Sequence, residues 1–240
     1  MPLRSFISIV ASPRPRMGKT LIARTLADFH LHNGRAVSGF DLNGDDPALA
    51  QFMPAFAKPA DVTDINGQMA LFDRLIADDG SYKIVDLGHP SFKTFFKVAN
   101  DIGFADEARR RDIATVVLFL VSPEDASVDA YRALRDDFAS AVVVPVYNEA
   151  FGGPQHRDKF ATLGPNAVLL QFPALAPGLR RHIDKRPFSF VDERTRGGSD
   201  IGLEGHNEIQ KWLRRVFLEF REMELRVLLG DLQKSLKIGS

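Results

Sequence analysis

The sequence predicts an α/β fold in which a mostly parallel sheet carries helices on both faces, followed by a helical C-terminal extension. Short apolar runs alternate along the chain with longer segments of helical periodicity, which is the order produced by parallel strands and crossover helices. The run Thr115–Val121 is almost purely apolar, as expected of a strand buried on both faces of a sheet. At 240 residues, 45% hydrophobic and 26% charged, the chain can form one large domain with an appendage. We expect the domain to span residues 1–200 and the extension residues 201–240.

The first expected elements are the strand Phe6–Ala11 and the helix Lys19–Asn33, whose apolar residues recur at helical spacing and which Asn33-Gly34 closes. The other expected strands are apolar runs of strand length: Ala36–Asp41, Lys83–Leu87, Thr115–Val121, Ala141–Tyr147 and Val168–Phe172. The other expected helices have helical or amphipathic patterns: Ala48–Met53, Gly67–Asp78, Ser91–Ile102 and Glu124–Phe138.

Three further segments are assigned from charge, glycine content and periodicity. Arg109-Arg110-Arg111 lies in an expected charged bend, and Arg194–Gly205 is expected to be a linker because it is rich in glycine and charge. From Asn207 to about Lys237 the pattern is helical, with an expected break near Gly230. The apolar stripe of this segment favours a helix that packs on the domain or on a partner subunit rather than one that binds a membrane surface.

Composition limits the classes of function. The 31 basic residues balance the 31 acidic residues, so nucleic-acid binding would need a local basic patch. Without cysteine the chain can form neither disulfides nor thiolate metal sites. No apolar run reaches membrane-spanning length, and Met1-Pro2-Leu3-Arg4 leads into a strand rather than a signal peptide. We therefore expect a soluble cytoplasmic protein.

The loop between the first strand and the first helix ends in Gly18-Lys19-Thr20, the sequence that closes a P-loop. In that setting, backbone N–H groups at the helix start point at phosphate oxygens and the helix dipole favours the anion. Lys19 is expected to reach the β- and γ-phosphates and Thr20 to ligate Mg²⁺. Asp86 ends the third strand and is expected to hold the same metal, directly or through water. These residues predict a site for a nucleoside triphosphate with Mg²⁺.

Asp41 ends the second strand, and strand carboxyl ends line the ligand crevice of an open parallel sheet. We expect it to orient or activate an attacking water. Asp45 and Asp46 follow in a turn rich in Asp, Asn, Gly and Pro, a composition that turns favour without any further function. For these two carboxylates, a role near the metal and a role in the turn both remain open.

In order and spacing, these motifs resemble those of the ParA/MinD group of P-loop ATPases, which carry a deviant Walker A motif. The group's Lys-Gly-Gly-x-Gly-Lys-Thr/Ser loop is matched by Arg14-Pro15-Arg16-Met17-Gly18-Lys19-Thr20, and its Asp-x-Asp-Pro pattern loosely by Asp41-Leu42-Asn43 with Pro47. Its Gly/Pro switch is matched by Asp86-Leu87-Gly88-His89-Pro90. Downstream, Val144–Asn148 is similar to the group's strand whose last asparagine contacts the adenine, and Phe172–Leu175 followed by Arg180–Pro187 is similar to its later loop on the base side. The resemblance covers roughly residues 4–192.

The resemblance implies an ATPase that binds ATP and Mg²⁺ between two subunits of an ATP-dependent homodimer, with hydrolysis resetting the dimer. It assigns catalytic roles to Lys19, to Asp41 and to Arg14, which holds the place of the lysine that reaches the partner's nucleotide; Arg16 is the second candidate for that place. It assigns Mg²⁺ to Thr20 and Asp86. The residues that it places around the nucleotide are Arg16, Met17, Gly18, Lys19, Thr20, Leu21, Asn148, Pro173 and Ala174.

The chain departs from the group's pattern at positions that bear on hydrolysis. Pro13 and Pro15 lack an N–H, and Arg16 carries a Cβ where a glycine would tolerate unusual dihedrals. Asn43 replaces the second aspartate and cannot act as a carboxylate base. The alternative is therefore a degenerate nucleotide-binding scaffold, with little or no hydrolysis, that recruits protein partners. The segment Asn148–Phe151 lacks the Asn-Lys-x-Asp of guanine-specific GTPases, so ATP is the expected nucleotide.

The resemblance suggests a role in DNA partitioning, plasmid transfer or stability, or subcellular positioning, with a protein partner or activator. Val85–Phe92 is similar to the Asp-x-Gly-x-x-Ser-Phe switch of ATPases encoded with plasmid transfer and stability functions. Lys211, Arg214 and Arg215 could contact DNA phosphates without sequence specificity, although a basic cluster of this size is also typical of a solvated helix face. An ATP-dependent ligase or kinase of the same fold is a third alternative.

Overall fold

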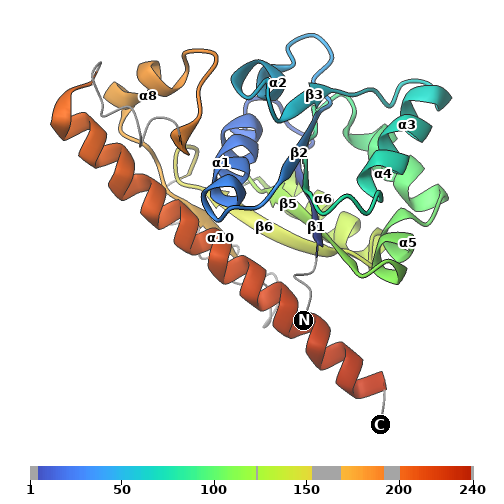
Figure 1. Cartoon of the computed structure of the whole chain (residues 1–240). Coiled ribbons are helices and arrows are strands. Elements are labelled where there is room, and N and C mark those ends of the chain that lie inside the picture. Colours follow the sequence, from blue (N-terminus) through green and yellow to red (C-terminus); the bar gives the residue numbers. More distant parts are fainter. Residues whose placement is uncertain (1–4, 123, 153–168, 192–200, 239–240) are drawn as a thin grey trace.

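In the part of the chain that the structure describes, seven strands form one sheet in the order β3-β2-β4-β1-β5-β6-β7 (Figure 1). The computed structural model describes residues 5–122, 124–152, 169–191 and 201–238, with 231–238 as backbone. The strands are β1 (Ser5–Ala11), β2 (Val37–Asp41), β3 (Ala57–Pro59), β4 (Tyr82–Asp86), β5 (Ile113–Leu120), β6 (Val142–Asn148) and β7 (Leu170–Phe172). All pairings among them are parallel. Because the strand order moves outward on both sides of β1, the ligand crevice is expected at the carboxyl end of β1.

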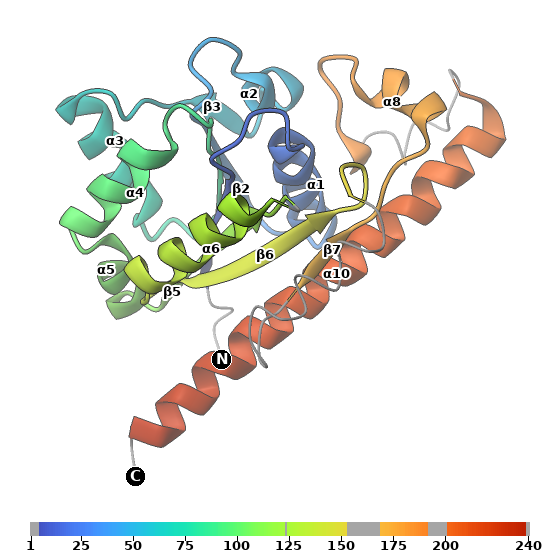
Figure 2. The same ribbon diagram turned by 180° about the vertical axis from the view of Figure 1, so that it is seen from behind.

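Helices cover both faces of the sheet (Figures 1 and 2). The described helices are α1 (Lys19–His32), α2 (Ala48–Phe52), α3 (Ile65–Leu75), α4 (Phe92–Asp101), α5 (Phe104–Arg110), α6 (Asp125–Asp137), α8 (Pro177–Ile183) and α10 (Gly202–Ile238). One core cluster joins the sheet to α1, α2, α8 and α10, and a second joins it to α3, α4, α5 and α6. The mostly parallel α/β sheet with helices on both faces, predicted from the sequence, is confirmed.

The apolar strands follow from burial on both faces. In β5, Val116 and Leu118 belong to one core cluster, and Val117 and Phe119 belong to the other. All four are fully buried, and period-2 alternation sends neighbouring side chains to opposite faces. A strand with two buried faces therefore needs an unbroken apolar run.

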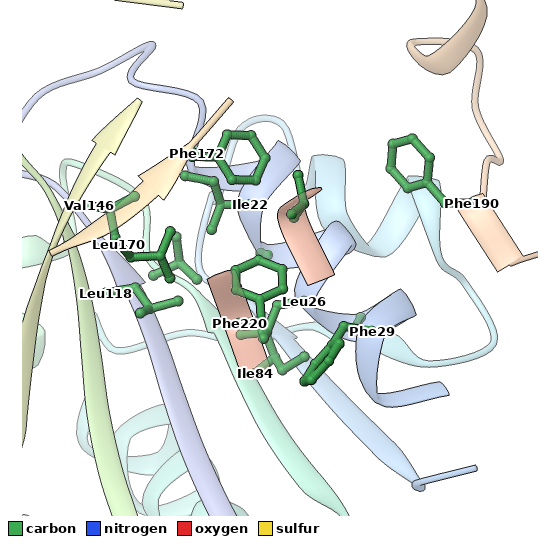
Figure 3. Close-up of a cluster of buried hydrophobic side chains, with 14 of the residues drawn as sticks. Ile22, Leu26, Phe29, Ile84, Leu118, Val146, Leu170, Phe172, Phe190 and Phe220 are labelled. Atoms are coloured by element: carbon green, nitrogen blue, oxygen red, sulfur yellow. The ribbon is translucent and has the colours of Figure 1, made fainter. Parts of the chain in front are cut away.

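The C-terminal helix α10 crosses the sheet beside β6 and β7 (Figure 2). Its Phe220 is buried in the cluster with Phe29 and Leu170 (Figure 3). Trp212 Nε1 donates to the carbonyl of Pro173 at 2.8 Å. Glu219 accepts the backbone N–H of Gln171, in β7, at 3.0 Å, so the helix satisfies a donor of the outermost strand. The extension is thus packed on the domain.

Two expectations for the C-terminal region are wrong. The helix runs through Gly230 without a break, since one glycine costs a helix only about 1 kcal/mol and the upstream turns are anchored on the core. It also begins at Gly202, so the expected linker does not extend to Gly205; residues 194–200 of that linker lie outside the described residues. A Cβ on Gly205 would lie 3.1 Å from Ile201 Cβ and 3.2 Å from Leu179 Cδ2, in α8. Its glycine therefore reflects close packing between helices rather than a flexible chain.

The expected charged bend is also wrong, because Arg109 and Arg110 form the last turn of α5. The helix is anchored by the buried side chains of Phe104 and Ala108, and cations are favoured at a helix C-terminus. Within the described ranges, the sequence patterns also missed two short elements, β3 and α8. β7 begins at Leu170, and residue 168, where we expected its start, lies outside the described residues.

None of the helices in the described ranges combines the length and the apolar character that crossing a bilayer requires.

Candidate functional site

A cavity of about 880 Å³ lies at the carboxyl edge of the sheet. It is lined by the loop after β1 and the start of α1 (residues 15–21), by the loop after β2 (residues 43–46), by His89 and Pro90 after β4, and by Phe151 after β6. The segment from Arg180 to Arg186 closes another side. The cavity therefore lies where the ligand crevice of a doubly wound sheet is expected.

Asn148 supports the loop that contains Gly18. Gly18 has a φ of 85°, in the left-handed region that favours glycine. A Cβ at this position would lie 2.7 Å from Asn148 Nδ2, and the same amide group donates to the carbonyl of Met17 at 3.2 Å. Arg16 also has a positive φ, of 58°. In this loop conformation, position 18 has room only for glycine, which has no side chain.

Lys19 begins α1 with a buried side chain. Its Nζ donates to the carbonyl of Arg14 at 3.1 Å, so the ammonium group is held against the loop. Burial lowers the pKa of Lys19, and the nearby carboxylate of Asp86 opposes that change. A buried ammonium group whose partner is a neutral carbonyl gains from an anionic ligand, because opposite charges attract strongly where water is excluded.

Thr20 and Asp86 form the predicted metal pair. Thr20 Oγ1 donates to Asp86 Oδ2 at 2.6 Å, which joins the start of α1 to the end of β4. Asp86 is fully buried, and its pKa is raised to about 7. Burial is the largest cause and the carboxylate of Asp41 acts in the same direction, whereas Thr20, Lys19 and Asn43 lower the pKa. Its other oxygen, Oδ1, is buried without a hydrogen-bond partner among the described residues.

The hydroxyl oxygen of Thr20 and the carboxylate of Asp86 are suitable ligands for Mg²⁺. A hydroxyl and a carboxylate oxygen are the hard ligands that Mg²⁺ prefers, and it usually takes one or two from the protein while phosphates and waters complete its octahedron. The described residues contain no group of three histidine or acidic side chains that could hold a metal alone. A metal bound beside Asp86 would also supply the partner that Oδ1 lacks.

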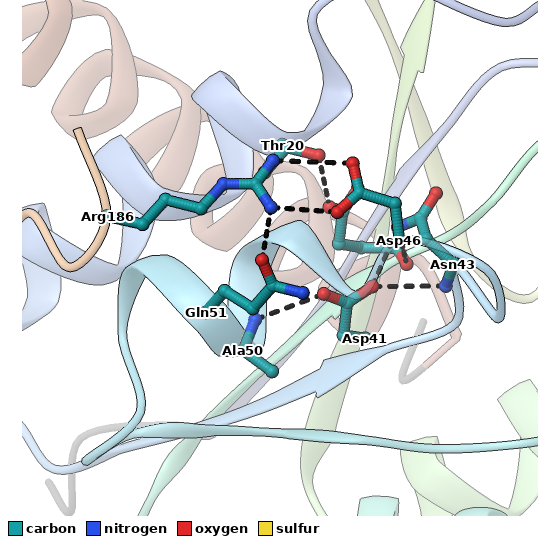
Figure 4. Close-up of polar contacts among 8 residues, drawn as sticks. Thr20, Asp41, Asn43, Asp46, Ala50, Gln51 and Arg186 are labelled. Atoms are coloured by element: carbon teal, nitrogen blue, oxygen red, sulfur yellow. Dashed lines mark hydrogen bonds and ion pairs between the residues drawn. The ribbon is translucent and has the colours of Figure 1, made fainter. Parts of the chain in front are cut away.

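Asp41 lies beside this pair. Of the three residues only Thr20 lines the cavity; Asp41 and Asp86 do not. Its Oδ1 accepts the backbone N–H and the side-chain amide of Asn43, at 3.1 and 2.8 Å. Its Oδ2 accepts the N–H of Ala50 at 3.1 Å (Figure 4). Burial raises the pKa of Asp41, and these hydrogen bonds oppose that rise. In this conformation the carboxylate holds the turn after β2 against the first turn of α2.

Arg14 is also outside the cavity lining. Both of its terminal guanidinium nitrogens pair with the carboxylate of Glu124, which precedes α6. The two side chains are 37% and 56% exposed, so the pair lies at the surface. Arg16, by contrast, lines the cavity.

The expected base-side residues Asn148, Pro173 and Ala174 do not line the cavity. Asn148 supports the loop through Met17, the carbonyl of Pro173 accepts Trp212, and the N–H of Ala174 donates to Glu149 at 3.2 Å. The structure thus groups six predicted residues around one cavity: Arg16, Met17, Gly18, Lys19, Thr20 and Leu21. Phe151, which the sequence patterns did not single out as a ligand contact, also lines it.

Arg24, Arg180 and Arg186 also line the cavity. No motif indicated Arg24, whereas Arg180 and Arg186 lie in the segment Arg180–Pro187 that the resemblance assigned to the base side. Arg24 is buried against Phe52, with its guanidinium carbon 4.0 Å from the ring centroid, and it donates to the carbonyl of Ile183 at 2.6 Å. Burial lowers the pKa of Arg24 to about 10, with Asp184 opposing. Arg186 pairs with Asp46. The only signal for Arg24 in the sequence is a charged residue among the apolar positions of α1.

No family model matches the chain, and no curated protein matches it. Several solved structures do match the chain. The 54-kDa signal recognition particle protein of Aeropyrum pernix, in complex with GDP, matches with a TM-score of 0.52 and 13% identity over 89% of this chain. This chain spans 50% of that protein's length.

Two further structures match less well. A putative plasmid partition protein of Borrelia burgdorferi, bound to AMPPNP, has a TM-score of 0.43 and 10% identity, covering 89% of this chain and 99% of that one. A nucleotide-binding protein of Archaeoglobus fulgidus, in complex with ADP, has a TM-score of 0.38 and 14% identity, covering 88% of this chain and 87% of that one. The likeness to the signal recognition particle protein shows the fold: the chain is an α/β protein of the P-loop NTPase fold with a C-terminal helix.

Proposed function

We propose that the protein is a ParA/MinD-like ATPase that binds Mg²⁺ and ATP in the cavity at the carboxyl end of β1. The observation that carries the proposal is the pair Thr20–Asp86, with a buried carboxylate oxygen that has no described partner, next to the buried ammonium of Lys19. In a P-loop protein the hydroxyl and the carboxylate hold the metal and the lysine holds the phosphates.

Each residue has a role that its position supports. Backbone N–H groups at the start of α1 would bind phosphate oxygens together with the helix dipole. Lys19 would exchange the carbonyl of Arg14 for a phosphate, a stronger and charged acceptor. Thr20 and Asp86 would hold Mg²⁺, which when bound neutralises charge on the phosphates. The sequence Asn148–Phe151, which lacks the guanine-specific motif, supports ATP over GTP.

The proposed switch is a homodimer that forms with ATP and separates after hydrolysis, acting with a protein partner in DNA partitioning, plasmid transfer or stability, or subcellular positioning. Its support is the order of the ParA/MinD-like motifs in the sequence. Light scattering coupled to gel filtration, with and without ATP, tests the dimer directly.

Isothermal titration calorimetry tests the binding site. The wild type is expected to bind ATP with Mg²⁺, and Lys19→Ala is expected to bind it at least about tenfold more weakly, because one charge-assisted contact to phosphate contributes about 1.5–3 kcal/mol. Lys97→Ala is the matched control, since Lys97 is an exposed lysine on α4. Equal ATP affinity in Lys19→Ala and the wild type would refute the proposed site.

One observation favours a second candidate, a nucleotide-binding scaffold without hydrolysis. Both oxygens of Asp41 accept N–H groups, and Asn43 stands where a second carboxylate is expected. Single-turnover hydrolysis separates the two candidates. A measurable rate that Asp41→Asn abolishes, with ATP binding retained, supports the ATPase. Tight ATP binding without turnover in the wild type supports the scaffold.

A further inference from the structure

Arg186 spans the cavity mouth between two segments that are far apart in sequence. Its NH1 donates to Asp46 Oδ1 at 2.8 Å and its NH2 to Oδ2 at 3.3 Å. The same NH1 also donates to Gln51 Oε1, and the guanidinium lies 4.9 Å from the ring of Phe52. Figure 4 shows Arg186 reaching the loop after β2. The two terminal nitrogens of the guanidinium thus form a fork that can bind the two oxygens of an anion.

The position of this fork identifies the part of a nucleotide that it would meet. Asp46 follows β2, which pairs with β4 so that Asp41 lies opposite Asp86. Arg186 is therefore on the metal side of the cavity and lines it together with Thr20. Asn148 ends β6 and Phe151 follows it, on the other side of β1 in the sheet order. The metal side is where Mg²⁺ and the terminal phosphates lie in a P-loop site.

Two other cations near the site, Arg14 and Arg24, are less suited to this task. Arg14 is paired with Glu124 outside the cavity lining. Arg24 is buried and fixed by the carbonyl of Ile183. Arg186, with a side chain 34% exposed and an exposed carboxylate as its partner, can exchange that partner at little cost, because exposed ion pairs contribute about 0–1 kcal/mol.

We propose that Arg186 is a phosphate-binding residue that acts within the same subunit: it exchanges Asp46 for the terminal phosphate of the bound nucleotide. This inference rests on the proposed function. A guanidinium binds phosphate through two parallel hydrogen bonds, as it binds the carboxylate here. Asp46 then serves as the resting partner, and as an anion at the mouth of the cavity it competes with the phosphate for the same fork.

Calorimetry with ATP and with ADP, both with Mg²⁺, tests the exchange through the ratio of the two affinities. Arg186→Gln is expected to weaken ATP by about tenfold while ADP changes little, as expected for loss of one charged contact. Asp46→Asn is expected to act in the opposite direction and raise the preference for ATP. Arg181→Gln is the matched control, because Arg181 is an exposed arginine of α8 outside the cavity lining.

The outcomes separate this inference from the function on which it rests. If the wild type binds ATP through Lys19 but Arg186→Gln keeps the same ATP-to-ADP ratio as Arg181→Gln, the role of Arg186 is overturned and the proposed function stands. A lowered preference for ATP in Asp46→Asn also contradicts the exchange. If the wild type binds neither nucleotide, both the function and the role of Arg186 are overturned.

Discussion

Thr20 Oγ1 donates a hydrogen bond to Asp86 Oδ2 at 2.6 Å, across 66 positions of sequence. The contact exists because β1 and β4 are parallel neighbours, with Val10 opposite Asp86, and α1 starts within one loop of the end of β1. The end of one strand and the start of the following helix are thereby brought to the same edge of the sheet.

Asp86→Asn is expected to abolish the effect of Mg²⁺ on ATP affinity. Asparagine keeps the size and the acceptor for Thr20 but removes the negative charge that a divalent cation needs. In the wild type Mg²⁺ should strengthen ATP binding, and the variant should lose about ten- to a hundredfold of affinity with Mg²⁺ present. Calorimetry in the presence of Mg²⁺ and in the presence of EDTA measures the ATP affinity of the wild type and of the variant under both conditions.

Asp101→Asn is the control for this comparison, because Asp101 is an exposed carboxylate at the end of α4. An equal gain of affinity from Mg²⁺ in Asp86→Asn and Asp101→Asn would place the metal elsewhere.

The elements around this pair could be predicted from sequence because each is encoded locally. The apolar run before Ala11 and the helical pattern after Gly18 predict β1 and α1, and a strand ending in Asp86 predicts the second ligand. Parallel topology then brings the carboxyl ends together without any further information. The confirmed part of the fold is the part that periodicity alone can encode.

The remaining features depend on contacts between distant segments. Arg186 and Asp46 meet across 140 positions, and no local pattern predicts such a pair. The side chain of Arg14 is oriented by its ion pair with Glu124, 110 positions away. Its place in the loop motif had predicted that it reaches the nucleotide of a partner subunit. Gly205 signalled a linker by composition, but it serves close packing of α10 on Leu179. Tertiary packing overrides local composition at such positions.

Glu124→Gln is expected to favour the ATP-bound dimer. The variant removes the carboxylate that holds Arg14 in this structure and frees the arginine to reach a partner's nucleotide. The pair is exposed, so the dimerisation constant should rise by no more than about fivefold. Analytical ultracentrifugation with ATP measures the change, with Asp129→Asn on α6 as the control.

Arg14→Gln should have the opposite effect on the dimer and little effect on ATP affinity in the monomer. A dimer that forms equally well in Arg14→Gln and the wild type would exclude a role for Arg14 between subunits.

Asp28 makes stability depend on pH in a defined window. Its carboxylate accepts Ser189 Oγ and the N–H of Phe190, and burial raises its pKa from 3.8 to about 6, against these hydrogen bonds. Between pH 3.8 and about pH 6, the Asp28 carboxyl is protonated in the folded state and ionised in the unfolded state. The contribution of Asp28 to stability is therefore full below about pH 4 and falls as pH rises toward 6.

Urea unfolding of the wild type and Asp28→Asn at several pH values isolates this contribution. The free energy of unfolding of the wild type should fall relative to the variant by on the order of a few kcal/mol between pH 4 and 7. His30, whose pKa burial lowers to about 3, gives the opposite slope but is present in both proteins. A pH-independent difference between the two proteins would contradict the raised pKa of Asp28.

Gly18→Ala is expected to abolish ATP binding, and Gly80→Ala is its matched control. Both glycines have positive φ, 85° and 70°, so both variants bear the same backbone strain of about 1–2 kcal/mol. Only at Gly18 does the new Cβ meet another group, Asn148 Nδ2 at 2.7 Å, whereas the space around Gly80 is open.

The clash must displace either the loop or Asn148, which holds the carbonyl of Met17. In either case the backbone N–H groups that would bind phosphate move out of place. Thermal unfolding should show a loss of stability in both variants, larger in Gly18→Ala because of the added clash, while calorimetry should show ATP binding in Gly80→Ala alone. The double variant Gly18→Ala/Asn148→Ala removes the clash but not the strain, and it should not restore binding, because the support of the loop is lost with the amide. Full binding in Gly18→Ala would show that the loop does not need this conformation to hold the nucleotide.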